Sequence, residues 1–176
     1  QASGTYDKEN NINDDIYKQS SFQEKWAHLD VVTHSEVLAF EIKPCSLVMS
    51  EHLDIKEGEL VFYVKRVRFI DSNPITVEET WLPVALFPDL TYQVMQTSKY
   101  DFIENTKGMV IDRSEQELVP ILPPEDVAKQ LDIDPSQPII EKRTRGYLAN
   151  NTVFEYSRNY FTSNDYRFTL VARRQR

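Results

Sequence analysis

The sequence has few of the residues on which several common kinds of functional site depend. Cysteine occurs once, as Cys45, and glycine four times in 176 residues. A single cysteine cannot form an internal disulfide and is typical of a reducing compartment, so we expect a cytoplasmic protein. No G-x-G-x-x-G or G-x-x-x-x-G-K-[ST] pattern occurs, which excludes these two phosphate-binding loops.

Long apolar runs and metal-binding motifs are also missing. No segment approaches the roughly 18 apolar residues of a membrane span, and no signal peptide is visible, so no membrane contact is expected. His28, His34 and His52 lack a spacing such as H-E-x-x-H, and we expect neither a metal site nor a cofactor. No G-x-S-x-G motif indicates a serine nucleophile.

The charge balance argues against DNA binding by this chain alone. The net charge is -8, whereas phosphate contact requires clustered lysine and arginine. Hydrophobic residues make up 40% of the sequence, with nine Phe, nine Tyr and two Trp. This composition supports one domain with a sizeable core.

What the sequence does contain is a repeated pattern of charged residues. Leu-Asp-Ile occurs at 53–55 and 131–133, and Lys-Arg-x-Arg occurs at 65–68 and 142–145. The intervals from Arg66 to Arg143 and from Glu78 to Glu155 are both 77 positions. Two copies related by a pseudo-twofold axis could face each other across one site.

The pattern predicts an α+β domain made of two units, each with the order strand, helix, strand and hairpin strand. Polar residues 1–19 predict a linker or arm. Helices are predicted over 22–29, from Pro44 to Leu53, over 99–106 and over 124–131. Strands are predicted over 36–43, 60–70, 75–83, 109–119, 138–148, 152–161 and 166–173. Hairpins dominate, so we expect six main strands, mostly antiparallel, with flanking helices.

Arg66 and Arg68 are the first candidates for a binding site. Alternate residues of a strand share a face, so both guanidinium groups point the same way. Two adjacent buried guanidinium groups are costly without an anion, and arginine binds carboxylate or phosphate in a bidentate manner. They could form an anion site, or they could pair with Glu78 or another acid of the hairpin.

Ser98 and the two matching glutamates are the next candidates. Ser98 is predicted to cap the helix over 99–106, where free backbone N–H groups can bind an anion, although a plain cap is the alternative. Ser20 or Ser21 could cap the first helix in the same way. Glu78 and Glu155 could accept hydrogen bonds from ligand hydroxyls or an amine, or could form salt bridges within their hairpins.

Arg143 and Arg145 are interpreted differently from the first arginine pair. Glu141 lies beside them in the sequence and could neutralise them locally. We therefore predict a structural role for this second pair.

Several stretches, taken in order, resemble the effector-binding UTRA domain of GntR-type transcription regulators of the HutC subfamily. The stretches are Val64–Arg68, Pro74–Pro83, Thr97–Ile103, Glu141–Tyr147 and Val153–Ser157, with Ser20-Ser21-Phe22 similar to the start of the family's first helix. The resemblance implies the chorismate-lyase fold, a six-stranded antiparallel sheet with flanking helices. It also implies a homodimer with a pocket for a small metabolite, such as a sugar phosphate.

The same resemblance implies roles for particular residues. Residues matching Arg66, Arg68 and Ser98 hold the phosphate in members that bind sugar phosphates, and residues matching Glu78, Tyr100 and Glu155 line the rest of the pocket. Ser21 is included as a further contact. Phe161 stands where some members have tyrosine, and Asn164-Asp165-Tyr166 replaces a frequent Asp-Arg-Tyr. These departures concern the part of the pocket that reads the sugar.

The expected function is that of a ligand sensor in a bacterial transcription regulator. An anionic metabolite would control DNA binding by a winged helix-turn-helix domain that precedes this sequence. Residues 1–19 would be the linker and 20–176 the effector-binding domain. The alternatives are a chorismate-lyase-like enzyme on the same fold and a module that only dimerises.

Overall fold

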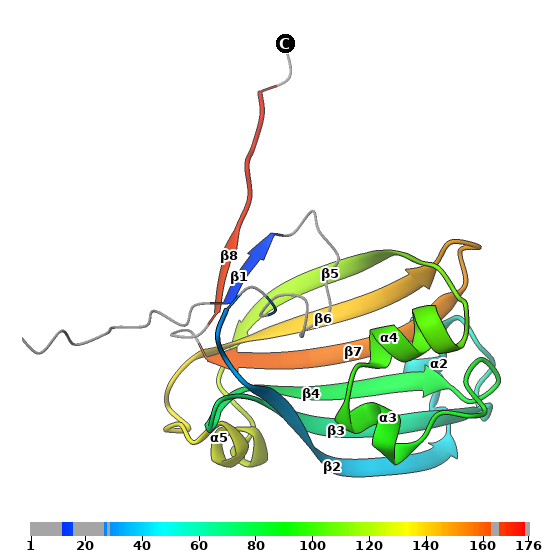
Figure 1. The fold of residues 1–176 in the computed structure, drawn as a ribbon, viewed down its shortest axis with the longest axis horizontal. Coiled ribbons are helices and arrows are strands. Elements are labelled where there is room, and N and C mark those ends of the chain that lie inside the picture. Colours follow the sequence, from blue (N-terminus) through cyan, green and yellow to red (C-terminus); the bar gives the residue numbers. More distant parts are fainter. Residues whose placement is uncertain (1–11, 16–26, 28, 163–165, 175–176) are drawn as a thin grey trace, which may run out of the picture.

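A computed structural model describes residues 12–15, 27, 29–162 and 166–174. Six strands form one antiparallel sheet in the order β2-β3-β4-β7-β6-β5, while β1 and β8 form a separate parallel pair (Figure 1). The strands are β1 Ile12–Asp15, β2 Thr33–Pro44, β3 Leu60–Ile70, β4 Asn73–Pro83, β5 Ile111–Ile121, β6 Ile139–Leu148, β7 Val153–Thr162 and β8 Tyr166–Thr169. The helices are α2 Leu47–Leu53, α3 Tyr92–Gln96, α4 Lys99–Asp101, the π-helical turn η1 Phe102–Thr106 and α5 Glu125–Leu131.

The strand order confirms the predicted α+β fold and its internal repeat. The strands β2, β3 and β4 form one half of the sheet, and β5, β6 and β7 form the other, so the halves meet between β4 and β7. Helix α2 precedes β3 as α5 precedes β6. Asp54 and Asp132 end these two helices with the same left-handed φ of 54°. The repeated Leu-Asp-Ile sequence is therefore a repeated helix end.

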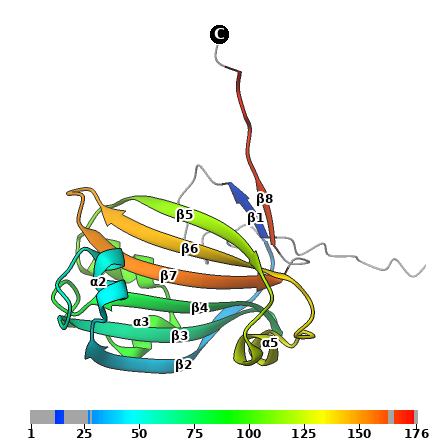
Figure 2. The same ribbon diagram turned by 180° about the vertical axis from the view of Figure 1, so that it is seen from behind.

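Helices cover both faces of the sheet. The short helices α3 and α4 lie over what we call the front face, in view in Figure 1, where Met95, Phe102 and Ile103 pack against Phe62 and Val64 of β3. Helices α2 and α5 lie on the back face, toward the viewer in Figure 2. Apolar residues on both sides of the sheet explain why the central strands are buried on both faces.

Two predicted elements differ from the structure, and one helix was not predicted. Pro44 ends β2 instead of opening a helix, and the Ser46 hydroxyl accepts from the Met49 N–H to cap α2. Helix α3 lies between the strand predicted over 75–83 and the helix predicted over 99–106, where no element was predicted. The last strand is shorter than predicted and pairs with β1, within the predicted arm, outside the main sheet. The predicted helix over 22–29 lies largely outside the described residues.

Candidate functional site

The strand register determines which charged side chains share a face of the sheet. Arg66 lies opposite Glu78, Glu78 opposite Asn159, and Asn159 opposite Lys142. Directly paired residues of antiparallel strands point to the same side, so these four side chains form one row. Arg66 donates from Nη1 to the Met95 carbonyl in α3 at 2.8 Å, which places the row on the front face.

The second arginine pair lies on the back face. Arg143 lies opposite Arg158 of β7, which lies opposite Glu79 of β4. Arg143 Nε donates to Glu141 Oε1 at 3.1 Å. Arg145 Nη2 lies 3.5 Å from the carbonyl of Glu51 in α2. The sequence repeat therefore does not bring its two arginine pairs to one site, because one residue along a strand reverses the side-chain direction.

Arg66 and Glu78 form a buried ion pair. Arg66 Nη2 lies 2.5 Å from Glu78 Oε1, and the two residues are 1% and 8% exposed. Thr80 also donates to Glu78 Oε1 at 2.9 Å. Arg68 Nη1 is farther away, 3.8 Å from Glu78 Oε2. Pairing of these arginines with Glu78, one of our two alternatives, is thus present, with the closer contact at Arg66.

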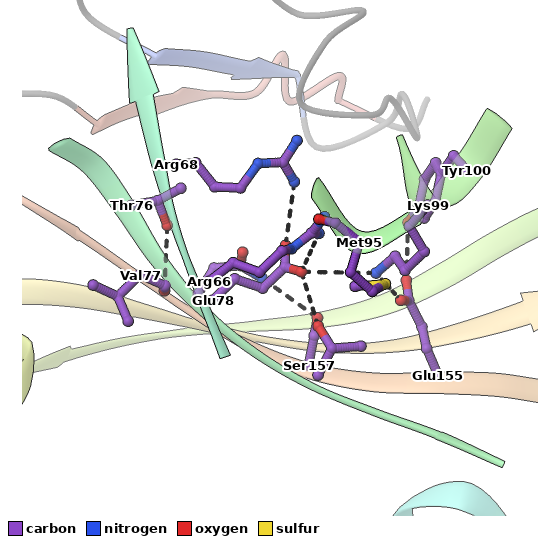
Figure 3. Close-up of polar contacts among 12 residues, drawn as sticks. Arg66, Arg68, Thr76, Val77, Glu78, Met95, Lys99, Tyr100, Glu155 and Ser157 are labelled. Carbon is purple, nitrogen blue, oxygen red and sulfur yellow. Dashed lines mark hydrogen bonds and ion pairs between the residues drawn. The ribbon is translucent and has the colours of Figure 1, made fainter. Parts of the chain in front are cut away.

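Lys99 joins this group, although the sequence did not single it out. It is the first residue of α4 and is only 7% exposed. Its Nζ donates to Glu155 Oε2 and lies 4.0 Å from Glu78 Oε1 (Figure 3). Tyr100 OH donates to Glu155 Oε1 at 3.0 Å. Lysines are rarely buried, so only its position between Ser98 and Tyr100, both predicted site residues, could have indicated it.

We call Arg66, Arg68, Glu78, Lys99 and Glu155 the front cluster. Its three cations and two carboxylates carry a net charge of +1. Burial and then the adjacent Arg66 lower the pKa of Arg68 to about 9, against the opposing effect of Glu78. Burial acts to raise the pKa of Glu78, but the charges of Arg66, Lys99 and Arg68 together hold it well below its ordinary value. The carboxylate is therefore kept ionised, and the guanidinium charge of Arg68 is disfavoured.

The remaining predicted site residues fall near the front cluster or outside the described residues. The Ser98 hydroxyl accepts from the Asp101 N–H at 3.2 Å, which confirms the predicted cap. Phe161 lies opposite Thr76, which lies opposite Arg68, so Phe161 shares the front face. Lys142 Nζ lies 5.5 Å from the centre of its ring. Ser21 lies outside the described residues.

Neither a metal centre nor a membrane-spanning helix is found in the part of the chain that the structure describes. No three side chains of His, Cys, Asp or Glu are placed there to hold a metal ion. None of the helices described is long and apolar enough to cross a membrane.

Comparison with known proteins identifies the family. The family model of the UTRA domain matches residues 28–167, most of the chain. The chain belongs to the UTRA domain family. This match confirms the resemblance seen in the sequence and covers both halves of the sheet.

Relatives of this UTRA domain are transcription regulators. The mannosyl-D-glycerate transport/metabolism system repressor MngR of Escherichia coli K12 is 53% identical over 175 residues, which are 99% of this chain and 73% of the relative. A GntR-family regulator from Bacillus cereus is 26% identical, with a TM-score of 0.71 over 80% of this chain and 99% of that one. PhnF from Mycobacterium smegmatis is 19% identical and shows the fold alone, with a TM-score of 0.83 over 94% of this chain and 73% of that one.

These similarities decide between the expected classes of function. The chain is the effector-binding domain of a GntR-type transcription regulator, because the named relatives are repressors and regulators. The alternative of a chorismate-lyase-like enzyme is thereby rejected.

Proposed function

We propose that this UTRA domain binds a small sugar that carries an acidic group, a sugar phosphate or a sugar acid. The observation that carries the proposal is the composition of the front cluster, in which three buried cations surround two carboxylates. Arginine side chains bind phosphate and carboxylate groups through charged hydrogen bonds. A buried site in which cations outnumber carboxylates therefore suits an anionic ligand on the front face.

The front cluster suggests a division of roles. Arg66 is fixed by Glu78 and the Met95 carbonyl, so it would present its charge in a set position. Arg68 and Ser98 would contact the acidic group together with Arg66, since guanidinium groups and capped helix starts suit phosphate or carboxylate.

The sugar would lie against the other predicted residues. Glu78 and Glu155 would accept hydrogen bonds from sugar hydroxyls, with Tyr100 holding Glu155 in place. Phe161 would pack against the ring, and Ser21 would add a further contact.

The relative MngR suggests which sugar to test first. Its name refers to mannosyl-D-glycerate, a molecule that combines the hydroxyls of mannose with the carboxylate of glycerate. Both kinds of group match the front cluster. We therefore propose mannosyl-D-glycerate, or a phosphorylated form of it, as the first ligand class for this domain.

Calorimetric titration tests the proposed ligand. Wild type and Arg68→Ala would be titrated with mannosyl-D-glycerate, mannose 6-phosphate and mannose. We expect binding of the two acidic ligands only. Arg68→Ala should bind at least tenfold more weakly, because tenfold corresponds to about 1.4 kcal/mol and a charged hydrogen bond typically contributes about 1.5–3 kcal/mol. Arg143→Ala on the back face is the matched control and should bind like wild type. Equal affinities of Arg68→Ala and wild type would contradict the assignment.

We also propose that the domain is a homodimer of the HutC type and that a preceding winged helix-turn-helix domain binds DNA in the cytoplasm. Residues 1–19 would then link the two domains.

The segment that rises away from the sheet is the proposed dimer interface (Figure 1). It carries three exposed apolar side chains, Phe168, Leu170 and Val171, which are 44%, 50% and 72% exposed. Exposed apolar side chains of this kind are typical of an interface. Sedimentation velocity should give a dimer for wild type and a monomer for Leu170→Asp/Val171→Asp.

A further inference from the structure

Helix α4 places one ammonium group between glutamates from the two halves of the sheet. Glu78 belongs to β4 and Glu155 to β7, and Lys99 contacts Glu155 while its Nζ lies 4.0 Å from Glu78 Oε1 (Figure 3). Lys99 is 7% exposed and Glu155 is 1% exposed. The ammonium group is therefore largely withdrawn from water and faces two carboxylates.

Lys99 also sets the charge of the front cluster. The two arginines and two glutamates alone would cancel, so the net charge of +1 depends on Lys99. Without it, Glu155 would be a buried carboxylate whose described polar partner is the Tyr100 hydroxyl. Such a carboxylate favours a cationic partner, and the ammonium group of an amino sugar would be suitable.

We propose that Lys99 is the internal counter-ion of Glu155 and that it determines specificity by excluding amino sugars. The inference rests on the proposed function, since it concerns which acidic sugars the front cluster accepts. A ligand ammonium group near Glu155 would meet the like charge of Lys99, whereas a hydroxyl group would meet no such penalty. Rejection of a competitor by a like charge is a general route to specificity.

A pair of matched ligands tests the specificity. Glucose 6-phosphate and glucosamine 6-phosphate differ in one substituent, a hydroxyl in the first and an ammonium group in the second. Wild type should prefer glucose 6-phosphate. In Lys99→Met the ratio of the two affinities should move at least tenfold toward the amino sugar. Because a ratio is measured, a general loss of affinity or stability in the variant does not imitate this result.

Lys107→Met is the matched control. Lys107 lies in the same stretch of chain but pairs at 2.8 Å with Asp89, whose side chain is half exposed. Its removal should leave the ratio of affinities unchanged. An unchanged ratio in Lys99→Met would overturn the proposed specificity.

A second measurement does not need a sugar ligand. Lys99→Ala removes the ammonium group together with most of its stem, so propylammonium chloride should raise its melting temperature by several degrees more than sodium chloride of equal ionic strength. Wild type and the double variant Lys99→Ala/Glu155→Gln should show no such difference. The double variant carries no unpaired charge at this position, which keeps the comparison available even if the single variant is weakly folded.

The two measurements separate the inference from the proposed function. Absence of the propylammonium effect in Lys99→Ala would overturn the counter-ion role. If propylammonium stabilises Lys99→Ala but no acidic sugar binds any form of the protein, the counter-ion role of Lys99 is supported and the proposed function fails.

Discussion

Arg66 and Arg143 hold matching positions in the sequence repeat, yet their side chains point to opposite faces of one sheet. Arg66 shares its row with Glu78 on the front face, and Arg143 shares its row with Arg158 on the back. The Arg66 side chain is 1% exposed and that of Arg143 is 38% exposed. The same substitution at these two positions should therefore have different consequences.

Replacing Arg66 is expected to destabilise the domain strongly. Arg66→Met would leave the buried carboxylate of Glu78 without its closest partner, at 2.5 Å, and would free the Met95 carbonyl. Removing one partner of a buried ion pair typically costs about 3–5 kcal/mol. The free energy of unfolding, measured by urea denaturation, should fall by an amount in this range.

Arg143→Met is the control for this experiment. Arg143 pairs with Glu141 and Glu117 on the back face, where it is partly solvated. Ion pairs at such positions contribute about 0–1 kcal/mol. Equal losses of stability in Arg66→Met and Arg143→Met would contradict the burial difference that we describe.

Acid is expected to weaken the fold through Glu78. The pKa of Glu78 in the folded protein lies well below its ordinary value of 4.5, so the unfolded chain takes up the proton first as the pH falls. The contribution of Glu78 is present above pH 4.5 and is lost progressively below it. Melting temperatures from about pH 7 to about pH 3 should fall more steeply for wild type than for Glu78→Gln.

Comparing how the melting temperature changes with pH in wild type and in Glu78→Gln separates the contribution of Glu78 from that of other acidic residues. Asp126 also has a lowered pKa, chiefly because Lys65 hydrogen-bonds it, and this effect is present in both proteins. An equal fall of the melting temperature with pH in wild type and Glu78→Gln would show that Glu78 does not contribute to the acid sensitivity.

Local sequence signals predicted much of the fold. Strand β3 was expected over 60–70 and occupies Leu60–Ile70. The segment is rich in β-branched and aromatic residues, which favour strands. Ser98 was recognised as a cap because hydroxyl groups at this position accept from the first free N–H groups of a helix. The repeat of helix ends and hairpins predicted the order of the six strands of the main sheet along the chain, but β1 and α3 were not predicted.

Long-range geometry could not be obtained in this way. Whether the side chains of Arg143 and Arg66 lie on the same face of the sheet depends on the strand register to within one residue, and the sequence repeat does not determine that register. The burial of Lys99 depends on the placement of α4 over β7, which no local signal encodes. Phe161 and Tyr100 were located only through the family resemblance.

Gly146 permits a close approach that an alanine would prevent. A Cβ atom at this position would lie 2.8 Å from Phe154 Cε1 and 3.0 Å from Glu155 Cγ. Overpacking of this kind typically costs about 1–3 kcal/mol, so Gly146→Ala should lower the free energy of unfolding by that amount. Displacement of Glu155 should also weaken binding of the ligand. Unchanged stability and unchanged affinity together would show that β6 and β7 can separate without cost.

The two helix ends of the repeat offer a test of its structural equivalence. Asp54 and Asp132 both have a φ of 54°, a backbone conformation that is strained for residues other than glycine. Each also places a carboxylate at the carbonyl end of a helix, which is unfavourable. Asp54→Gly and Asp132→Gly should therefore each raise the free energy of unfolding, by about 0.5–1 kcal/mol in urea denaturation.

The turn between β3 and β4 provides the control for the helix ends. Asp71 has a similar φ of 52°, but its Oδ1 accepts from the Val32 N–H at 3.1 Å. Asp71→Gly relieves the same backbone strain and loses this hydrogen bond, worth about 1 kcal/mol, so little net gain is expected. The gains at Asp54 and Asp132 should add in the double variant, because the two helices pack in different core clusters. A gain at one helix end and a loss at the other would mean that the two units of the repeat share a backbone shape without sharing its energetic cause.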